Sequence, residues 1–129
     1  MLRAKLAAFA SALILVGTAF ANREVCPELS AIQAEGVSMA MEVYGMYATY
    51  QLSNFNTDSS WGFIIAPIAA NSMVEAIGNA NDILRKMTTP GVLLQESLCN
   101  YETGNPDVYA IAIQDELLTA TKLRQYIRH

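Results

Sequence analysis

Apolar residues recur along the chain at spacings of three and four, which is the pattern of amphipathic helices. The first such run extends from Pro27 to about Ser53, and Glu28, Glu35 and Glu42 recur every seven residues on a separate polar stripe. Its apolar stripe consists of Leu29, Ile32, Gly36, Met39, Val43, Met46 and Tyr50. We predict one long helix over this run, packed on one or two others.

Three further runs have the same periodicity, and two of them begin at a proline that follows a good N-cap, Thr89 or Asn105. We predict helices over residues 67–87, 90–101 and 106–127. Their apolar positions are Ala70, Met73, Ile77, Ala80, Leu84 and Met87 in the first, Leu94 and Leu98 in the second, and Tyr109, Ile113, Leu117 and Ala120 in the last.

Few strand signals compete with these helices. Phe63 to Ile65 is the only short β-like run, and residues 54–60 have the composition of a loop. The sequence therefore predicts an all-α fold, a small up-and-down bundle of about four helices with one disulfide. About 108 residues, 22–129, form a single domain in this interpretation.

The N-terminus has the organisation of a secretory signal. Arg3 and Lys5 precede an uncharged stretch rich in Ala and Leu, which ends in the small residues Ala19 and Ala21. We expect residues 1–21 to be a cleaved signal peptide and the protein to be periplasmic or secreted; an uncleaved N-terminal anchor is the alternative. After cleavage no stable membrane insertion is expected, because no basic face flanks an apolar one.

Two cysteines remain in the mature chain, Cys26 and Cys99. In an exported protein they most simply form one disulfide, and two free thiols are the alternative. The enclosed loop of about 73 residues corresponds to about 4 kcal/mol of stabilisation in the chain-entropy estimate. No histidine lies near either cysteine, so a zinc site is not expected.

Composition and charge restrict the classes of function. The chain is 53% hydrophobic, with a formal net charge of -4 and a sequence pI of about 4.8. Loss of the two basic residues of the signal leaves 6 basic against 12 acidic side chains. This acidity excludes a basic nucleic-acid-binding protein, so no nucleic-acid partner is expected.

Signals for catalysis are nearly absent. The single histidine, His129, is the last residue, so a Ser-His or Cys-His pair has no base. Zinc, EF-hand and phosphate-loop motifs are missing, and glycines such as Gly36, Gly45 and Gly78 stand singly. We predict no catalytic residues, no metal and no cofactor. An enzyme that uses carboxylates alone, for example Asp115 and Glu116, is the remaining catalytic alternative.

The segment from Val43 to Val74 is apolar and rich in aromatic residues, and its one charged residue is Asp58. Tyrosine and tryptophan are enriched at interface hot spots, so this segment is a candidate contact surface for another protein. The predicted partner-binding residues are Tyr47, Phe55, Asp58, Trp61 and Phe63. The alternative is that these aromatic side chains form the core.

Three short motifs resemble the HdeA acid-chaperone family and periplasmic immunity proteins that neutralise peptidoglycan-cleaving toxins. They are Cys26-Pro-Glu-Leu29, Tyr44-Gly-Met-Tyr47, and Cys99 seven residues before Pro106 with Ala110-Ile111 following. The resemblance implies a non-enzymatic protein that works by binding. An HdeA-like protein would be a homodimer at neutral pH that exposes apolar surface on acidification, and an immunity protein would plug the active site of one enzyme.

We therefore predict a non-enzymatic binding protein of the cell envelope that inhibits or sequesters a partner protein, in the manner of an immunity protein. A periplasmic acid-stress chaperone that holds unfolding clients is one alternative. A structural subunit of an envelope or secretion complex is another.

Overall fold

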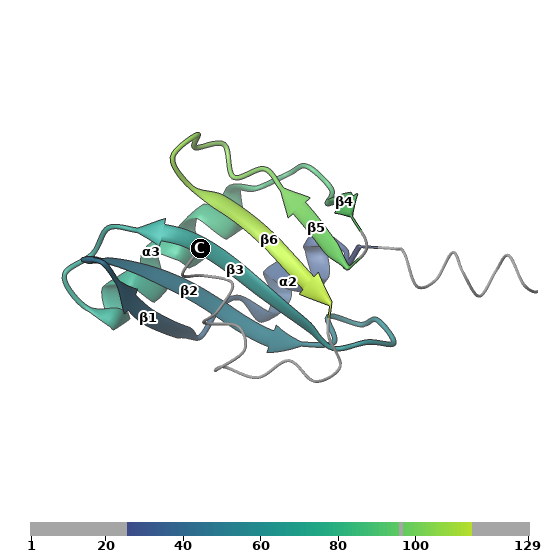
Figure 1. The fold of residues 1–129 in the computed structure, drawn as a ribbon, viewed down its shortest axis with the longest axis horizontal. Coiled ribbons are helices and arrows are strands. Elements are labelled where there is room, and N and C mark those ends of the chain that lie inside the picture. The colour runs from purple at the N-terminus through teal and green to yellow at the C-terminus, as the bar shows by residue number, and fades with distance from the viewer. Residues whose placement is uncertain (1–25, 96, 115–129) are drawn as a thin grey trace, which may run out of the picture.

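The computed structural model describes residues 26–95 and 97–114, and over these residues it is a six-stranded antiparallel sheet with two helices (Figure 1). In chain order the elements are α2 (Leu29–Glu35), β1 (Met39–Val43), β2 (Met46–Ser53), β3 (Trp61–Ile68), α3 (Met73–Lys86), β4 (Val92–Gln95), β5 (Leu98–Tyr101) and β6 (Tyr109–Gln114). The all-α, helical-bundle prediction is therefore wrong.

The sheet consists of two three-stranded meanders that meet at its centre. Its order is β1-β2-β3-β6-β5-β4, so β3 pairs with β6 and the edges are β1 and β4. Each meander is preceded by a helix, α2 before β1 and α3 before β4. The two segments around Ile64 and Ile111, far apart in the sequence, are thereby paired side by side.

The long helix predicted over residues 27–53 is replaced by α2 and the β1–β2 hairpin. The hairpin register pairs Val43 with Met46, which leaves a two-residue turn of Tyr44 and Gly45. Both turn residues have positive φ, 51° and 81°, as the tight turns of β-hairpins require. The Tyr-Gly pair is thus a hairpin turn, which the helical interpretation placed inside a helix.

Helix α3 confirms part of the helix predicted over residues 67–87. Ser72 is its N-cap, and the Ser72 hydroxyl accepts a hydrogen bond from the Glu75 amide at 3.1 Å. Ala76, Ala80 and Leu84 are buried at helical spacing, where α3 packs over β1, β2 and β3. Here the helical period reflects a single buried face.

The other two predicted helices are wrong over the described residues. Residues 90–101 contain the β4–β5 hairpin, and residues 109–114 of the predicted last helix form β6. The remainder of that helix and the predicted signal peptide, residues 1–21, lie outside the described residues. Of the described helices, none has both the length and the apolarity to cross a bilayer.

The strands were misread because the sheet buries apolar residues on both faces. A sheet with one wet face shows alternation of apolar and polar residues, whereas burial of both faces removes that signal. The helix-side core lies under α2 and α3 and includes Phe55, Trp61, Phe63, Ile65, Cys99 and Tyr101. The second-face cluster, on the opposite face, consists of Met41, Ala48, Tyr50, Ile64, Ala66 and Ile113.

Candidate functional site

The start of α2 is tied to the sheet by two long-range links. The predicted disulfide between Cys26 and Cys99 is present, with Cα atoms 5.9 Å apart. Two residues further along β5, the buried Tyr101 hydroxyl donates a hydrogen bond of 2.5 Å to the Pro27 carbonyl. Burial raises the pKa of the Tyr101 phenol above its usual range, so the hydroxyl keeps the proton that it donates.

The end of α2 is held against α3 by side-chain amides. Gln33 Nε2 donates to the carbonyls of Leu84 at 2.9 Å and Met87 at 3.0 Å, where α3 ends. The Asn81 amide bonds both the N–H and the carbonyl of Val37, each at 3.0 Å. A helix of seven residues is marginal by itself, so these ties account for its stability.

Gly36 makes the approach of Asn81 feasible. It has φ of +73°, and a Cβ at this position would lie 2.8 Å from Asn81 Oδ1. Any other residue here would strain the backbone and displace the amide that fixes Val37.

The loop between β2 and β3, residues 54–60, is organised by hydrogen bonds to two hydroxyl groups. Ser53 Oγ donates to Glu35 Oε2 at 2.5 Å and accepts from the Phe55 amide at 3.1 Å. Thr57 Oγ1 accepts from Trp61 Nε1 at 3.0 Å and donates to the Asn54 carbonyl at 2.7 Å. The first pair ties the loop to the end of α2, and the second ties it to β3.

Two consecutive residues of this loop, Phe55 and Asn56, have left-handed φ of 48° and 64°. Such a conformation is costly for an aromatic residue and persists only where the surroundings determine it. Phe55 is 1% exposed, and its ring meets that of Phe63 edge to face, with the ring centroids 6.4 Å apart. Burial of the ring therefore stabilises a loop shape that turns Asn56 toward the surface.

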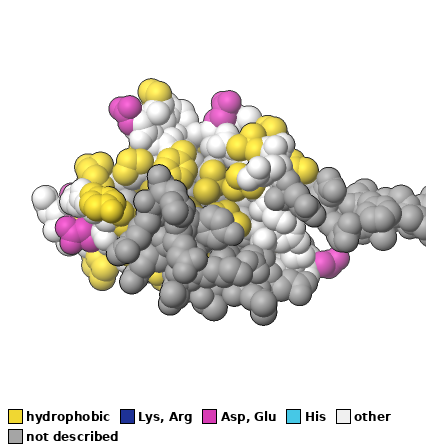
Figure 2. Space-filling view, in the orientation of Figure 1, with side chains coloured by type: hydrophobic (Ala, Val, Ile, Leu, Met, Phe, Trp, Pro, Cys, Tyr) yellow, Lys and Arg dark blue, Asp and Glu magenta, His cyan; other side chains and the backbone are white. Residues whose placement is uncertain are grey.

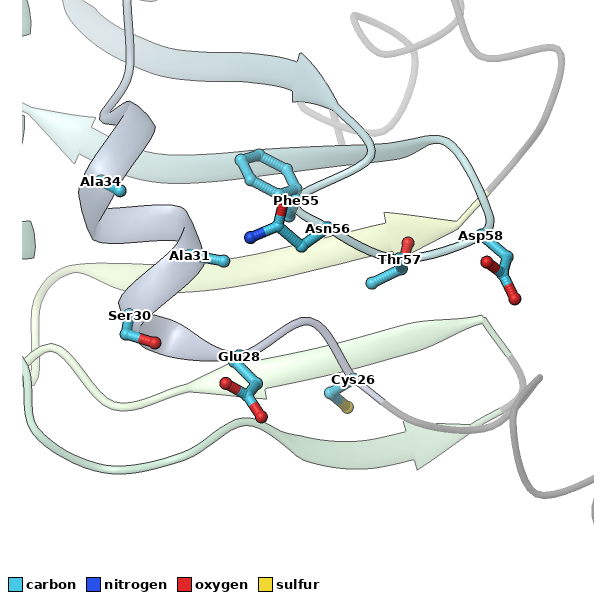
Figure 3. Close-up of a pocket in the computed structure, with 9 residues that line it drawn as sticks. All are labelled: Cys26, Glu28, Ser30, Ala31, Ala34, Phe55, Asn56, Thr57 and Asp58. Carbon is cyan, nitrogen blue, oxygen red and sulfur yellow. The ribbon is translucent and has the colours of Figure 1, made fainter.

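A pocket of about 610 Å³ lies between α2 and this loop (Figure 3). Small side chains of α2, such as Ala31, form one wall, and Asn56 and Thr57 of the loop form the other. Acidic residues stand at both ends, Glu28 before α2 and Asp58 on the loop. The lining residues are Cys26, Glu28, Ser30, Ala31, Ala34, Phe55, Asn56, Thr57 and Asp58, and none of them is basic. We call this hollow the α2 pocket.

A second hollow of about 490 Å³ lies on the other side of residues 26–30. It shares Cys26, Glu28 and Ser30 with the α2 pocket and is otherwise bounded by Pro27, Leu29, Thr88, Pro90, Gly91 and Leu93. Gly91 lies against the Tyr101 ring, because a Cβ there would fall 2.5 Å from Tyr101 Cζ. Residues 26–30 therefore form a ridge between two hollows. The disulfide to Cys99 and the hydrogen bond from Tyr101 attach this ridge to β5.

The described surface is strongly acidic. Residues 26–95 and 97–114 contain two basic side chains, Arg85 and Lys86, and Arg85 is paired with Asp82. The acidic residues are Glu28, Glu35, Glu42, Asp58, Glu75, Asp82, Glu102 and Asp107. On the face of Figure 2, Asp and Glu side chains appear at several separate places, and no Lys or Arg is seen among the coloured residues.

The predicted partner-binding residues lie in different environments. Phe55, Trp61 and Phe63 are 1%, 2% and 0% exposed and belong to the helix-side core. Tyr47 is partly buried against that core. Asp58 is exposed at the α2 pocket. Only Phe55 and Asp58 therefore meet at one site, and the three buried aromatic residues have the place that the core interpretation gives them.

Sequence reasoning missed the polar lining of this pocket. Asn56 and Thr57 were recognised only as loop residues, and Glu28 as one of three acidic residues, with Glu35 and Glu42, on the polar stripe of a long helix. The Cys26–Cys99 pair is the sequence feature that could have indicated a shared site, because the disulfide holds the segment that contains Glu28 against the sheet. Nothing in the sequence of the loop indicates the left-handed backbone at Phe55.

Over the described residues, no group of three or more His, Cys, Asp or Glu side chains is arranged to hold a metal ion. His129 and the Asp115–Glu116 pair lie outside those residues. The chemistry that the α2 pocket offers is hydrogen bonding by Asn56 and Thr57, together with negative charge from Glu28 and Asp58. Such a lining suits a cationic or hydrogen-bond-donating group.

Comparison with known proteins gives one match. No curated protein and no solved structure has significant similarity to the chain. A family profile, described as a domain of unknown function (DUF4949), matches residues 25–126 and so spans every described residue. The chain therefore belongs to the DUF4949 family.

Proposed function

We propose that the protein is a non-enzymatic binding protein of the cell envelope, which inhibits or sequesters a partner protein by accepting a basic side chain of that partner in the α2 pocket. The observation that carries the proposal is the pocket itself. It combines two carboxylate residues, Glu28 and Asp58, with no basic lining residue, and both of its walls are fixed in place.

Rigidity supports a binding role. The ridge side is held by the disulfide and by Tyr101, and the loop side is held by Ser53 and Thr57. A pocket that is already formed loses little conformational entropy when it is occupied, which favours affinity. A lysine or arginine that enters it would form charge-assisted hydrogen bonds with the acidic residues at its ends.

The cell-envelope location in this proposal rests on two features. The disulfide is compatible with an oxidising compartment outside the cytosol. The N-terminal pattern of Arg3 and Lys5 followed by an Ala- and Leu-rich stretch is typical of an export signal. We infer that the mature chain acts in the periplasm or after secretion.

The test is quantitative co-purification of the tagged protein from the envelope fraction of its own cells, for the native chain and for Glu28→Gln/Asp58→Asn. We expect one partner at near one-to-one ratio with the native chain. Loss of both charges should weaken its binding by about tenfold or more, because neutralising paired charges at an interface costs upward of 1.4 kcal/mol.

The matched control is Glu102→Gln/Asp107→Asn, which changes the net charge equally at exposed residues that do not line the α2 pocket. This variant should retain the partner. Equal loss in both variants would mean that general acidity, not the pocket, attracts the partner. Undiminished binding by Glu28→Gln/Asp58→Asn would exclude the α2 pocket as the contact site.

A further inference from the structure

The second hollow, between residues 26–30 and residues 88–93, has a largely apolar lining. Five of its nine lining residues have no polar group in the side chain: Pro27, Leu29, Pro90, Gly91 and Leu93. Leu29 and Leu93 are partly buried against the helix-side core, and both also line the hollow. The one charged residue among its described lining is Glu28, on the ridge. The second hollow thus suits an apolar group, whereas the α2 pocket has a carboxylate at each end.

Both walls of the second hollow are held in place. The disulfide and the Tyr101 hydroxyl attach the ridge to β5. On the opposite wall, the Met87 carbonyl, directly before Thr88, accepts a hydrogen bond of 3.0 Å from Gln33 Nε2 of α2. Gly91 lies so close to the Tyr101 ring that a Cβ would fall 2.5 Å from Tyr101 Cζ. The hollow is therefore formed before a ligand enters, which lowers the entropic cost of binding.

The two hollows are close enough for one short segment to reach both. They share Cys26, Glu28 and Ser30, which lie along the start of α2 in Figure 3. A helix with its side chains is about 10 Å wide, and an extended chain advances about 3.3 Å per residue. An extended segment therefore crosses the ridge with about three residues. The volume of about 490 Å³ is ample for one aliphatic or aromatic side chain.

The charge around the ridge determines which kind of segment can lie there. The described residues hold eight acidic and two basic side chains, and Glu28 borders both hollows. An acidic segment would be repelled, whereas a segment with a basic residue is complementary. A basic side chain complements Glu28 and Asp58 in the α2 pocket, and an apolar one can contact Leu29 and Leu93 in the second hollow.

We propose that the partner presents an extended segment that lies across the ridge of residues 26–30. Its basic side chain occupies the α2 pocket, and an apolar side chain about three residues away occupies the second hollow. This two-anchor proposal rests on the proposed function, because it takes the basic side chain in the α2 pocket from there. It adds the second anchor and the spacing between the two.

The test uses random linear peptides displayed against the oxidised native protein. We expect the enriched peptides to share one lysine or arginine and one aliphatic or aromatic residue at a constant spacing of about two to four residues. The affinity of the best synthetic peptide is then measured by fluorescence anisotropy. Replacing its apolar residue by alanine should weaken binding about tenfold, since burial of one such side chain contributes on that order.

Thr88→Trp locates the apolar anchor, because Thr88 is exposed and lines the second hollow only. A bulky ring there should weaken the parent peptide about tenfold and leave the alanine peptide nearly unaffected, so the two changes are coupled. The matched control is Thr89→Trp, at an exposed neighbour that lines neither hollow, and it should bind as the native chain does. Asp58→Asn should couple in the same way to loss of the basic residue of the peptide.

NMR spectra of the native protein give a readout that needs no variant. The methyl signals of Leu29 and Leu93 should shift when the parent peptide binds and shift much less with the alanine peptide. Unshifted methyl signals, or equal binding of both peptides to the native chain, would overturn the two-anchor proposal.

The outcomes also separate the two proposals. A shared basic residue that couples to Asp58, without an apolar residue at constant spacing, would overturn the two-anchor proposal and leave the proposed function standing. Enriched peptides without a basic residue, or with one that does not couple to Asp58, would overturn both. No enrichment at all would overturn the two-anchor proposal, because a preformed site with two anchors selects linear sequences.

Discussion

The two faces of the sheet are built from the same strands but are held in different ways. On the helix side, the aromatic rings of Phe63 and Tyr101 meet edge to face with centroids 5.7 Å apart, and Tyr101 also bonds the backbone before α2. The second-face cluster is aliphatic apart from Tyr50 and contains Met41 and Ala48. Directional links specify the first core, whereas apolar burial alone specifies the second.

The two cores also differ in the elements that contribute residues to them. Residues of α2 and α3 and the disulfide all contribute to the helix-side core. The second-face cluster consists of strand residues, and neither described helix contributes to it. Neighbouring residues show the division most clearly: Ile65 points to the helix side and Ile64 to the second face.

The largest expected effect comes from removing the link specific to the helix side. Cys26→Ala/Cys99→Ala opens a loop whose ends are 73 residues apart, and the free energy of unfolding should fall by about 4 kcal/mol. Chemical denaturation of the oxidised native chain and of the variant measures this. A loss below about 1 kcal/mol would show that α2 is held by its hydrogen bonds without the disulfide.

The comparison is sharpened by a matched pair in β3. Ile65→Ala should lower the free energy of unfolding by about 3–4 kcal/mol and Ile64→Ala by about 2–3 kcal/mol. The second-face core, which has no directional links, can close part of the cavity that the smaller side chain at residue 64 leaves. Both residues are almost fully buried, at 0% and 1% exposure, so burial itself does not separate them. Urea denaturation of the two variants checks the order, and an equal or reversed order would break the proposed contrast.

Tyr101→Phe should cost about 1–2 kcal/mol at neutral pH, since it leaves the Pro27 carbonyl without its buried donor. Burial raises the pKa of Tyr101, so the unfolded chain ionises near pH 10 while the folded chain stays neutral. The stabilisation is complete below about pH 10 and is lost as the pH rises above it.

Denaturation curves at pH 8, 10 and 11 measure this dependence. Tyr109 has a pKa shifted in the same direction by burial and contributes to the same loss. The alkaline loss of stability should therefore be smaller in Tyr101→Phe than in the native chain, though still present. An identical pH dependence in both proteins would contradict the assignment to Tyr101.

The smallest effect is expected at the exposed β4 edge of the sheet. Leu94 is 60% exposed on the edge strand β4, so Leu94→Thr should change the free energy of unfolding by less than about 0.5 kcal/mol. Thermal denaturation of this variant beside Ile64→Ala measures the difference between an exposed and a buried aliphatic side chain of the sheet. A loss above 1 kcal/mol would indicate that Leu94 is covered in solution.

Sequence reasoning recovered local features of the fold and missed its architecture. Helix α3 was predicted from an apolar stripe that includes Ala80 and Leu84, and these two residues are buried on one face together with Ala76, so the helical period survives in the sequence. The strands were missed because β2 and β3 bury residues on both sides, as Tyr50 and Phe63 show. Apolar residues on both faces of a strand also match helical spacing by chance.

The candidate site was predicted in part. Asp58 was singled out as the one charge in an apolar segment, and it lies at the α2 pocket. Its aromatic neighbours Trp61 and Phe63 lie in the core instead, because the loop turns between them and Asp58. The opposite wall, around Ala31, comes from a segment over 20 residues away, and its position depends on the disulfide and on Asn81.

The sequence by itself determined the acidity of the chain, the pairing of its two cysteines, the helical character of residues 73–86 and the loop of residues 54–60. These depend on composition or on neighbours within a few residues, where propensity and spacing act directly. Only the tertiary structure decided that residues 39–53 form a hairpin, that β3 meets β6, and that Glu28 and Asp58 share a pocket. The physical reason is that strand pairing and two-sided burial join residues far apart in the chain, and such contacts leave no periodic trace in either partner alone.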